Sequence, residues 1–377
     1  MMSSTGTSGS REGAFAFGQG LNWGLILTVF LLGLVGVGTL YSAAGGSFEP
    51  WAWRHGLRLI VGLFLMLAVA ALDVRLLYNG AYLVFGGLLL LLLSVQLFGD
   101  VTMGAKRWLD LGIVTVQPSE FIRLGMILAL ARFYQSIHQD VVSHFQNLFV
   151  RALIILVPVA LIINQPDLGT TIMLAVSGVG VLFLAGLNWR YFAAGAVGIV
   201  ATVPLVWQRL LDYQKERVLV FLNPERDPLG AGYHIIQSKI GIGSGGLFGK
   251  GFSEGTQSRL NFLPEKHTDF VFTIYAEEMG FVGSVLLLVL FVLLLVQLAF
   301  IANQMRSQFA RLVVGGIGFS LFVYIFINLA MVMGLAPVVG VPLPFISYGG
   351  TSMLTFLLSI GVVLSLERQV RVEMSRG

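Results

Sequence analysis

The sequence predicts an all-α integral membrane protein with about ten transmembrane helices and one long extracytoplasmic loop. Apolar residues make up 56% of the 377 residues and charged residues only 11%, whereas a soluble domain carries about 25% charged residues. The mean hydropathy is +0.86. The apolar residues gather in runs of about 20, the length that crosses a bilayer. One polar stretch, residues 209–268, interrupts them.

Ten apolar runs are the candidate membrane spans. They lie near residues 21–42, 55–72, 77–98, 118–135, 148–164, 169–187, 191–208, 270–301, 312–334 and 345–366. Only a tight turn, Asn164–Asp167, separates the fifth run from the sixth. The eighth run is long enough to tilt in the bilayer or to extend beyond it. The chain shows no internal repeat, so the paired halves of many transporters are not predicted.

The chain divides into a membrane domain and two short tails. Residues 1–20 are rich in Ser and Gly and are expected to form a disordered cytoplasmic tail. The apolar run that follows is long enough to span and has few basic residues before it, which disfavours a signal peptide. Residues 21–367 form the polytopic membrane domain, and residues 368–377 form a second cytoplasmic tail. The absence of cysteine excludes disulfides, a thiolate nucleophile and a cysteine-ligated metal.

The short connections between spans predict the orientation, because cytoplasmic loops are enriched in Lys and Arg. One set of loop ends and tails contains Arg11, Arg75, Arg132, Arg151, Arg190, Arg306, Arg311, Arg368, Arg371 and Arg376. The opposite set contains Arg54, Arg58, Lys106 and Arg107. This imbalance places both termini in the cytoplasm and the stretch 209–268, between the seventh and eighth spans, outside it.

The stretch 209–268 concentrates positive charge in a glycine-rich loop. It contains eight of the 23 Lys and Arg residues: Arg209, Lys215, Arg217, Arg226, Lys239, Lys250, Arg259 and Lys266. Four charged residues between 209 and 216 follow helical spacing, which predicts either an interfacial helix or an extension of the seventh span. A basic loop at a membrane surface favours an anionic substrate. Around Lys250 the glycines would let backbone N–H groups approach a phosphate closely.

Charged residues inside spans indicate functional sites, because each costs roughly 2.5–3.5 kcal/mol at the bilayer centre. Pro118 suits the first position of the fourth helix, and Glu120 and Arg123 share a face three residues apart. They are expected to form either a self-satisfied pair near the interface or the charged wall of a water-filled cavity. Glu277 and Glu278 in the eighth span point to different faces, so at most one needs to face a cavity.

Further candidate residues lie at the ends of spans. Asp167 precedes the sixth span and is expected to cap that helix, a role compatible with catalysis. Asp269 stands beside Lys266 at the entrance to the eighth span, either as a helix cap or as a functional acid. Trp108 is typical of an interface anchor. A run of prolines and glycines around Ser347 breaks the approach to the last span, and such irregular backbone at membrane depth predicts a cavity.

Six segments between the third span and the last are recognisable together. They are KRWL (106–109), QPSE (117–120), QPDLGT (165–170), PERDPLGAGYHIIQSKIGIGSGG (224–246), GKGFSEGTQSRLNFLPEKHTDF (249–270) and VVGVPLPFISYGGTS (338–352). With these segments the chain resembles the SEDS family (shape, elongation, division and sporulation) of bacterial peptidoglycan glycosyltransferases. Residues 255–257 and 338–342 favour the elongation type over the division type. Residues 1–20 lie outside the resemblance.

The resemblance implies polymerisation of lipid II into glycan strands on the outer face of the cytoplasmic membrane during cell elongation. It also implies a class B penicillin-binding protein as the transpeptidase partner. Lipid II is an α-linked glycosyl diphosphate and the new bond is β, so the transfer inverts the anomeric carbon. Such a transfer needs a base for the acceptor hydroxyl and stabilisation of the departing diphosphate.

The family's motifs also assign roles to single residues. The essential loop acid falls on Asp269, the expected base, the tryptophan on Trp108, and the span-four acid on Glu120. The family often has Lys where this chain has Arg123, and Arg cannot donate a proton at neutral pH, so charge pairing is expected there. Arg123, Lys266 or a divalent cation, Mg²⁺ or Mn²⁺, would hold the diphosphate, although no ligand cluster identifies a metal. The expected substrate cavity also includes Asp167, Lys250 and Ser347.

Two other classes of function compete with the enzyme. A flippase that moves the lipid-linked precursor across the bilayer would also use a polar cavity between helices, but it needs polar groups at both membrane faces. A non-catalytic scaffold of the elongation complex would leave the intramembrane Glu120 and Arg123 unexplained. The long outward loop that ends in an acid favours the glycosyltransferase.

Overall fold

The computed structural model describes residues 20–102, 105–110, 115–136, 145–165, 167–210, 212–227, 231–256 and 265–376. Within these ranges, each of the ten predicted spans contains a long helix. The helices are α2 (Trp23–Ala43), α3 (Ala52–Ala70), α4 (Val74–Phe98), α5 (Pro118–Gln135), α6 (Phe145–Ile163), α7 (Leu168–Leu184), α8 (Trp189–Arg209), α12 (Val271–Gln304), α13 (Gln308–Val332) and α14 (Gly350–Arg376). Residues 1–19 of the predicted tail 1–20 lie outside the described residues.

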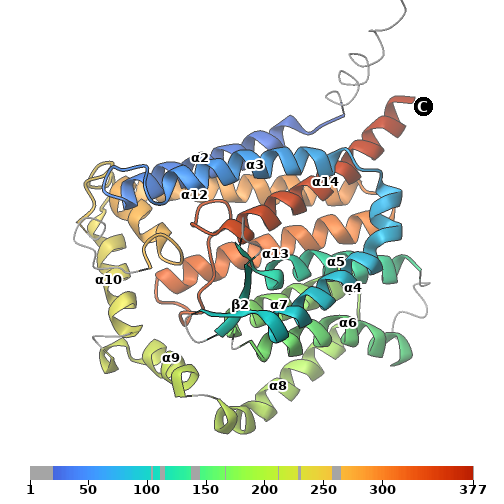
Figure 1. Cartoon of the computed structure of the whole chain (residues 1–377), viewed down its shortest axis with the longest axis horizontal. Helices are drawn as coiled ribbons and strands as arrows, with labels where there is room; N and C mark the ends of the chain where they lie inside the picture. The colour runs from blue at the N-terminus through green and yellow to red at the C-terminus, as the bar shows by residue number, and fades with distance from the viewer. Residues whose placement is uncertain are drawn as a thin grey trace, which may run out of the picture.

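The helices form one elongated bundle, with most axes running along its length (Figure 1). Six of them, α2, α3, α4, α12, α13 and α14, are long and apolar enough to cross a membrane, and α6, α7 and α8 contain shorter apolar stretches. Helix α5 carries Glu120, Arg123 and Arg132, which lower its hydropathy. The apolar side chains on the outside of such a bundle suit a lipid environment, which confirms the predicted membrane fold.

The centre of the bundle lies at α13 and α14. In their most apolar windows, 67% and 83% of the residues are buried, compared with 22% for α4. Helix α4 therefore faces outward over most of its length, whereas α13 and α14 pack against neighbours on nearly all sides. Arg123, for example, lies against Tyr324 of α13 and Phe356 of α14.

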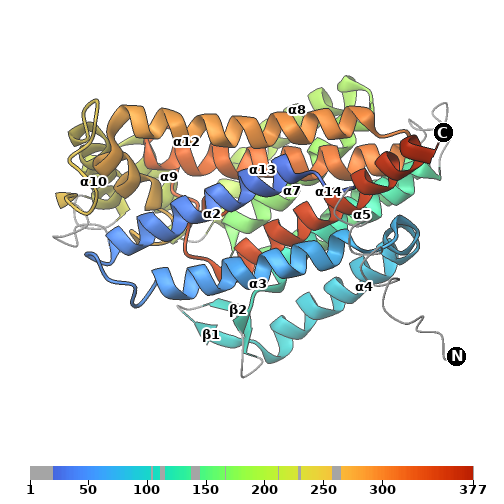
Figure 2. The same ribbon diagram turned by 90° about the horizontal axis from the view of Figure 1, so that it is seen from above.

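Both ends of the described chain lie at the same end of the bundle. Helix α2 begins beside the last part of α14 (Figure 2), where Asn22 Nδ2 donates to Glu367 Oε1 at 3.0 Å. Helix α10 (Ala231–Ser244) lies at the opposite end. The two ends of the described chain and helix α10 thus lie at opposite ends of the bundle. Helix α14 continues through Arg376, so most of the predicted C-terminal tail is helical.

The polar stretch folds onto the bundle. Helix α9 (Asp212–Leu222) is separate from α8, so the predicted extension of the seventh span is wrong and a distinct helix is present. A 3₁₀ turn, η2 (Pro224–Arg226), leads to α10. Ser238 of α10 lies 2.6 Å from Thr273 Oγ1 and donates to Val332 O at 2.7 Å. These buried contacts attach α10 to both α12 and α13.

A small antiparallel sheet was not predicted. It consists of β1 (Asp100–Thr102), β2 (Ala105–Asp110) and β3 (Thr115–Val116), in the order β1-β2-β3. These strands are too short to show a clear alternation of apolar and polar residues, which is the sequence signal for a strand. The sheet connects α4 to α5 and carries Trp108.

Helix α12 is interrupted rather than simply long. Gly280 adopts φ 65°, ψ −163°, which breaks the helix. The loop after α10 supplies the missing backbone partners: Lys250 N and Gly251 N donate to Glu277 O and Glu278 O, each at 3.1 Å. In return, Phe281 N donates to Gly246 O at 2.9 Å. These backbone hydrogen bonds join the polar stretch to the eighth span at the break. From the length of that span, the sequence predicted that it would tilt in the bilayer or extend beyond it.

Candidate functional site

Asp269 lies two residues before the start of α12 and is half-buried. The cap position of that helix belongs to Phe270, which makes no side-chain cap hydrogen bond in the described structure, so the N-cap interpretation of Asp269 is wrong. The Asp269 carboxylate lies against Gly340, where an added Cβ would be 3.3 Å from Oδ2. Its position beside this loop therefore does not come from a capping role.

The loop before α14 holds the residues in front of Asp269. Ser347 Oγ donates to Thr268 O at 2.6 Å, and Tyr348 N donates to His267 O at 2.8 Å. Ser347 Oγ also accepts from Leu343 N at 2.8 Å. Ser347 is buried, so its hydroxyl joins two loops rather than facing solvent. This contact brings the predicted site residues Ser347 and Asp269 into one region.

Positive and aromatic side chains surround the residues that lead up to the acid. The His267 ring stacks on Trp51 with centroids 4.5 Å apart, and Lys266 Nζ is 5.7 Å from the same ring centroid. Arg58 of α3 lies over the Tyr348 ring at 4.7 Å. Burial lowers the pKa of Lys266 and also that of His267, which is therefore neutral at pH 7. Cationic groups from α3 and from the polar stretch thus lie against the aromatic rings of Tyr348 and Trp51.

A second group of charges lies inside the bundle. Arg123 Nη2 is 3.6 Å from Glu120 Oε2, and the two side chains are only 4% and 6% exposed. The Arg123 guanidinium lies 4.1 Å from the Tyr324 ring centroid and 4.4 Å from that of Phe356. The predicted pair is confirmed, and it is buried among aromatic rings of α13 and α14.

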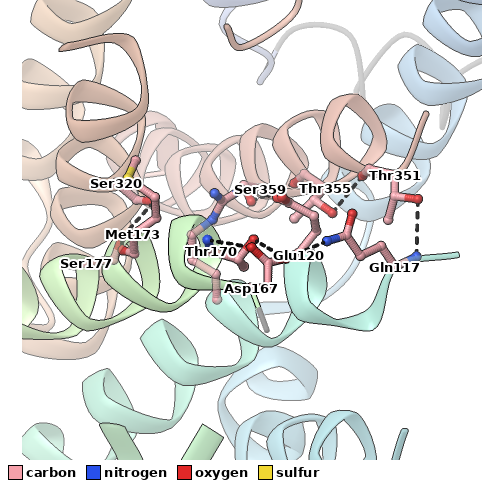
Figure 3. Close-up of polar contacts among 11 residues, drawn as sticks. Gln117, Glu120, Asp167, Thr170, Met173, Ser177, Ser320, Thr351, Thr355 and Ser359 are labelled. Carbon is pink, nitrogen blue, oxygen red and sulfur yellow. Dashed lines mark hydrogen bonds and ion pairs between the residues drawn. The ribbon is translucent and has the colours of Figure 1, made fainter. Parts of the chain in front are cut away.

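Several polar atoms of this interior group have no hydrogen-bond partner among the described residues. They are Ser119 Oγ, Glu120 Oε2, Arg123 Nη1 and Arg123 Nη2. Buried polar groups in folded proteins nearly always have a partner, so these atoms call for ordered water or a polar ligand. Figure 3 shows Glu120 between Asp167 and the polar face of α14 formed by Thr351, Thr355 and Ser359.

Asp167 caps α7, as predicted. Its Oδ1 accepts from Thr170 N at 3.2 Å and its Oδ2 from Thr170 Oγ1 at 3.0 Å. Gln117 Nε2 donates to Oδ2 at 3.3 Å, and Arg107 Nε lies 3.9 Å from the same atom. The sheet thus delivers Arg107 to this group. Trp108, the next residue of β2, is half-buried, and its predicted part in the site stays a prediction.

The two groups meet at the loop before α14. Two consecutive residues of that loop, Val339 and Gly340, each face one of the groups. An added Cβ on Gly169, two residues after Asp167, would be 2.3 Å from Val339 O, and Gly340 faces Asp269. Four residues after Ser347, Thr351 Oγ1 accepts from Gln117 N at 3.3 Å. The loop before α14 and the start of that helix thus contact both the segment of Asp269 and the segments that carry Asp167 and Glu120.

Lys250 lies in a third cluster. Its Nζ is 2.6 Å from Glu277 Oε1 and donates to Thr256 Oγ1 at 2.9 Å. Glu277 also accepts from Thr256 N at 3.0 Å. Lys250 thus neutralises a fully buried acid beside the break in α12. Its predicted part in substrate binding stays a prediction.

Sequence reasoning did not connect Arg58 and Trp51 with this region, where Arg58 lies over Tyr348 and Trp51 stacks on His267. Arg58 falls inside the predicted second span, and a charge at that depth is itself a signal for a functional position. For a metal, the described residues contain no group of three or more His, Cys, Asp or Glu side chains that could hold an ion. A magnesium ion in such a site would depend on oxygen atoms of the substrate.

Comparisons with known proteins place the chain in a family. A family model named for FtsW, RodA and SpoVE and described as cell cycle protein matches residues 20–372. Peptidoglycan glycosyltransferase MrdB of Escherichia coli K12 is 45% identical over 329 residues, which cover 87% of this chain and 88% of that protein. Peptidoglycan glycosyltransferase RodA of Treponema pallidum is 32% identical, with coverage of 91% and 96%.

Two solved structures share the fold. One is a chain of a peptidoglycan synthase complex described as coordinating polymerization and crosslinking, with a TM-score of 0.81 and 35% identity over 93% of this chain and 98% of that one. The other is the rod shape determining protein RodA of Thermus thermophilus, with a TM-score of 0.71 and 31% identity over 93% and 97%. The chain therefore belongs to the FtsW/RodA/SpoVE family, the SEDS family that its motifs indicated, and it is a peptidoglycan glycosyltransferase with a polytopic helical membrane fold.

Proposed function

We propose that this glycosyltransferase polymerises lipid II during cell elongation, on the extracytoplasmic face of the bacterial cytoplasmic membrane, with Asp269 as the general base. The observation that carries the proposal is the position of Asp269. It is half-buried at the entrance to α12, three residues after Lys266, and its carboxylate lies against Gly340 of the loop before α14. A carboxylate in this position is proposed to take the proton of the acceptor hydroxyl.

The proposed reaction has two requirements, deprotonation of the acceptor and stabilisation of the leaving group on the donor. The acceptor 4-hydroxyl attacks the anomeric carbon of the α-linked donor, Asp269 takes the hydroxyl proton, and the bond to the diphosphate breaks with inversion. Lys266, three residues before the acid, and Arg58, over the Tyr348 ring, are proposed to stabilise the charge on the departing diphosphate. The neutral His267 ring, stacked on Trp51, keeps one wall of the site apolar.

The interior group is proposed to extend the substrate site. Glu120 Oε2 would accept a hydrogen bond from water or from the substrate, and Arg123 Nη1 and Nη2 would donate to water or to substrate oxygens. Arg123 keeps its charge at every accessible pH, so it contributes charge pairing and not proton donation. Trp108 and Asp167 border the same region through β2 and α7.

A divalent cation, Mg²⁺ or Mn²⁺, is proposed to assist by neutralising the diphosphate. Magnesium commonly uses one or two protein carboxylates together with phosphate oxygens, which fits the sparse acids of this site. Chelation with EDTA is then expected to lower the polymerisation rate, and added Mg²⁺ or Mn²⁺ to restore it. An unchanged rate in EDTA would remove the cation from the proposal.

A class B penicillin-binding protein is proposed as the partner that crosslinks the new strands. The fold shared with a chain of a peptidoglycan synthase complex supports such an assembly. Both termini are proposed to lie in the cytoplasm, as the Lys and Arg distribution predicts.

One assay separates the enzyme from a flippase and from a scaffold. Purified full-length protein in liposomes, with its partner present, is given labelled lipid II on one face. The proposal predicts labelled glycan polymer. Movement of unpolymerised lipid II across the bilayer would favour the flippase. The absence of both polymer and lipid II movement would favour the scaffold.

A further inference from the structure

Asn328, near the end of α13, bridges two other segments of the chain through its side-chain amide. Its side chain is fully buried. Its Nδ2 donates to Asp269 O at 3.0 Å and to Val341 O at 2.7 Å. The two acceptors belong to segments that are distant in sequence: the entrance to α12 and the loop before α14.

The two carbonyl acceptors fix the orientation of the amide group. A carboxamide NH₂ carries two donor hydrogens, and here each has its own carbonyl oxygen. Turning the amide around would direct its oxygen at two other oxygens. Serine or threonine would supply one donor, alanine none, and an ionised aspartate would repel both carbonyls. Among small side chains, asparagine is therefore suited to bridging these two backbone atoms.

We propose that Asn328 is a positioning residue for Asp269, an inference that rests on the proposed role of Asp269 as the base. Asn328 ties the backbone of the acid to Val341, the residue after Gly340, and Gly340 is the residue that the Asp269 carboxylate faces. The amide thus sets the separation between the acid and the loop that faces it.

The neighbouring hydrogen bonds show what the Asn328 hydrogen bond adds to the position of the acid. The carbonyls of three consecutive residues, 267, 268 and 269, all accept hydrogen bonds, and the first two partners are Tyr348 and Ser347 of the loop itself. The third partner, Asn328, comes from α13, one of the two central helices of the bundle. The loop contacts hold the acid to the loop, and Asn328 holds both to the rigid core. A shift of about 1 Å in such a group costs on the order of 100-fold in rate.

The test compares Asn328→Ala with Ser320→Ala in the full-length protein with its partner. Ser320 is also buried on α13, and it contacts Ser177 Oγ at 3.2 Å, about two turns from Asn328. We expect Asn328→Ala to lower kcat for lipid II polymerisation by about 10- to 100-fold with little change in KM. Asn328→Ser, which keeps one donor, should fall between it and the wild type. Ser320→Ala should match Asn328→Ala in thermal stability and the wild type in rate.

Two further measurements distinguish positioning from a structural role. In the Asp269→Asn background, Asn328→Ala should cause little further loss, because both changes act on the same step. Hydrogen–deuterium exchange of residues 265–273 should rise in Asn328→Ala and stay unchanged in Ser320→Ala, whether or not the preparation polymerises.

Each contrary result has a distinct meaning. A normal kcat in Asn328→Ala, together with an inactive Asp269→Asn, would overturn the role of Asn328 alone. A normal rate in Asp269→Asn would overturn both the base assignment and this inference. Unchanged exchange in residues 265–273 of Asn328→Ala would overturn the positioning contact independently of any activity.

Discussion

Gly340 offers a way to move the Asp269 carboxylate without touching it. Gly340 adopts φ +74°, and an added Cβ would be 3.3 Å from Asp269 Oδ2. In Gly340→Ala the left-handed backbone costs about 1 kcal/mol for a residue with a Cβ. The methyl group would also displace the carboxylate by a few tenths of an ångström. Since a misplacement of about 1 Å costs on the order of 100-fold, we expect roughly a 10-fold loss of rate.

Gly186 supplies the matched control. It adopts φ +82° in the turn after α7, and an added Cβ there meets nothing within 4 Å. Gly186→Ala should therefore lose similar stability and keep the wild-type rate. The assay is the initial rate of lipid II polymerisation per folded molecule, with thermal stability measured in parallel. Equal rates in the two variants would refute the placement of Asp269 against Gly340 as a determinant of activity.

Three other predictions test the topology, the interior pair and the environment of the site. Single cysteines at Ser253 and Ser307 should differ, with only the first reacting with an impermeant thiol reagent in intact cells; the reverse would overturn the orientation. Glu120→Gln should reduce polymerisation and leave thermal stability nearly intact, whereas a collapse of stability with unchanged activity per folded molecule would make the pair structural. Burial lowers the pKa of His267 below its ordinary 6.5. As the pH falls, the unfolded chain therefore binds a proton at this residue before the folded protein does. The free energy of unfolding should then decrease as the pH falls below about 6.5. His267→Phe, which keeps a ring on Trp51, should weaken this pH dependence of the melting temperature, and an identical pH profile would contradict it.

The sequence predicted the parts of the fold that the membrane itself imposes. Lipid requires long apolar helices with satisfied backbones, so hydropathy alone located all ten helices. Local spacing also sufficed for the Glu120–Arg123 pair and for the cap at Asp167, because both depend on residues at most three positions apart.

Features that depend on contacts between distant segments were not predicted. The break at Gly280 is stabilised by backbone groups of residues 246–251, and nothing within the apolar run of the eighth span indicates it. Lys250 appears as a basic residue in a glycine-rich loop, yet it pairs with Glu277. Asn328 is a single polar residue in an apolar helix, and only the fold shows that its two acceptors are Asp269 O and Val341 O.

The most direct test of the central claim is the initial polymerisation rate of Asp269→Asn. Asparagine keeps the size of the side chain and removes its charge and basicity, and the backbone carbonyl that Asn328 binds remains. A general base contributes about 10²- to 10⁴-fold. We therefore predict that purified Asp269→Asn, folded and associated with its partner like the wild type, polymerises labelled lipid II at least about 100-fold more slowly. A rate close to that of the wild type would contradict the account and remove Asp269 from the mechanism.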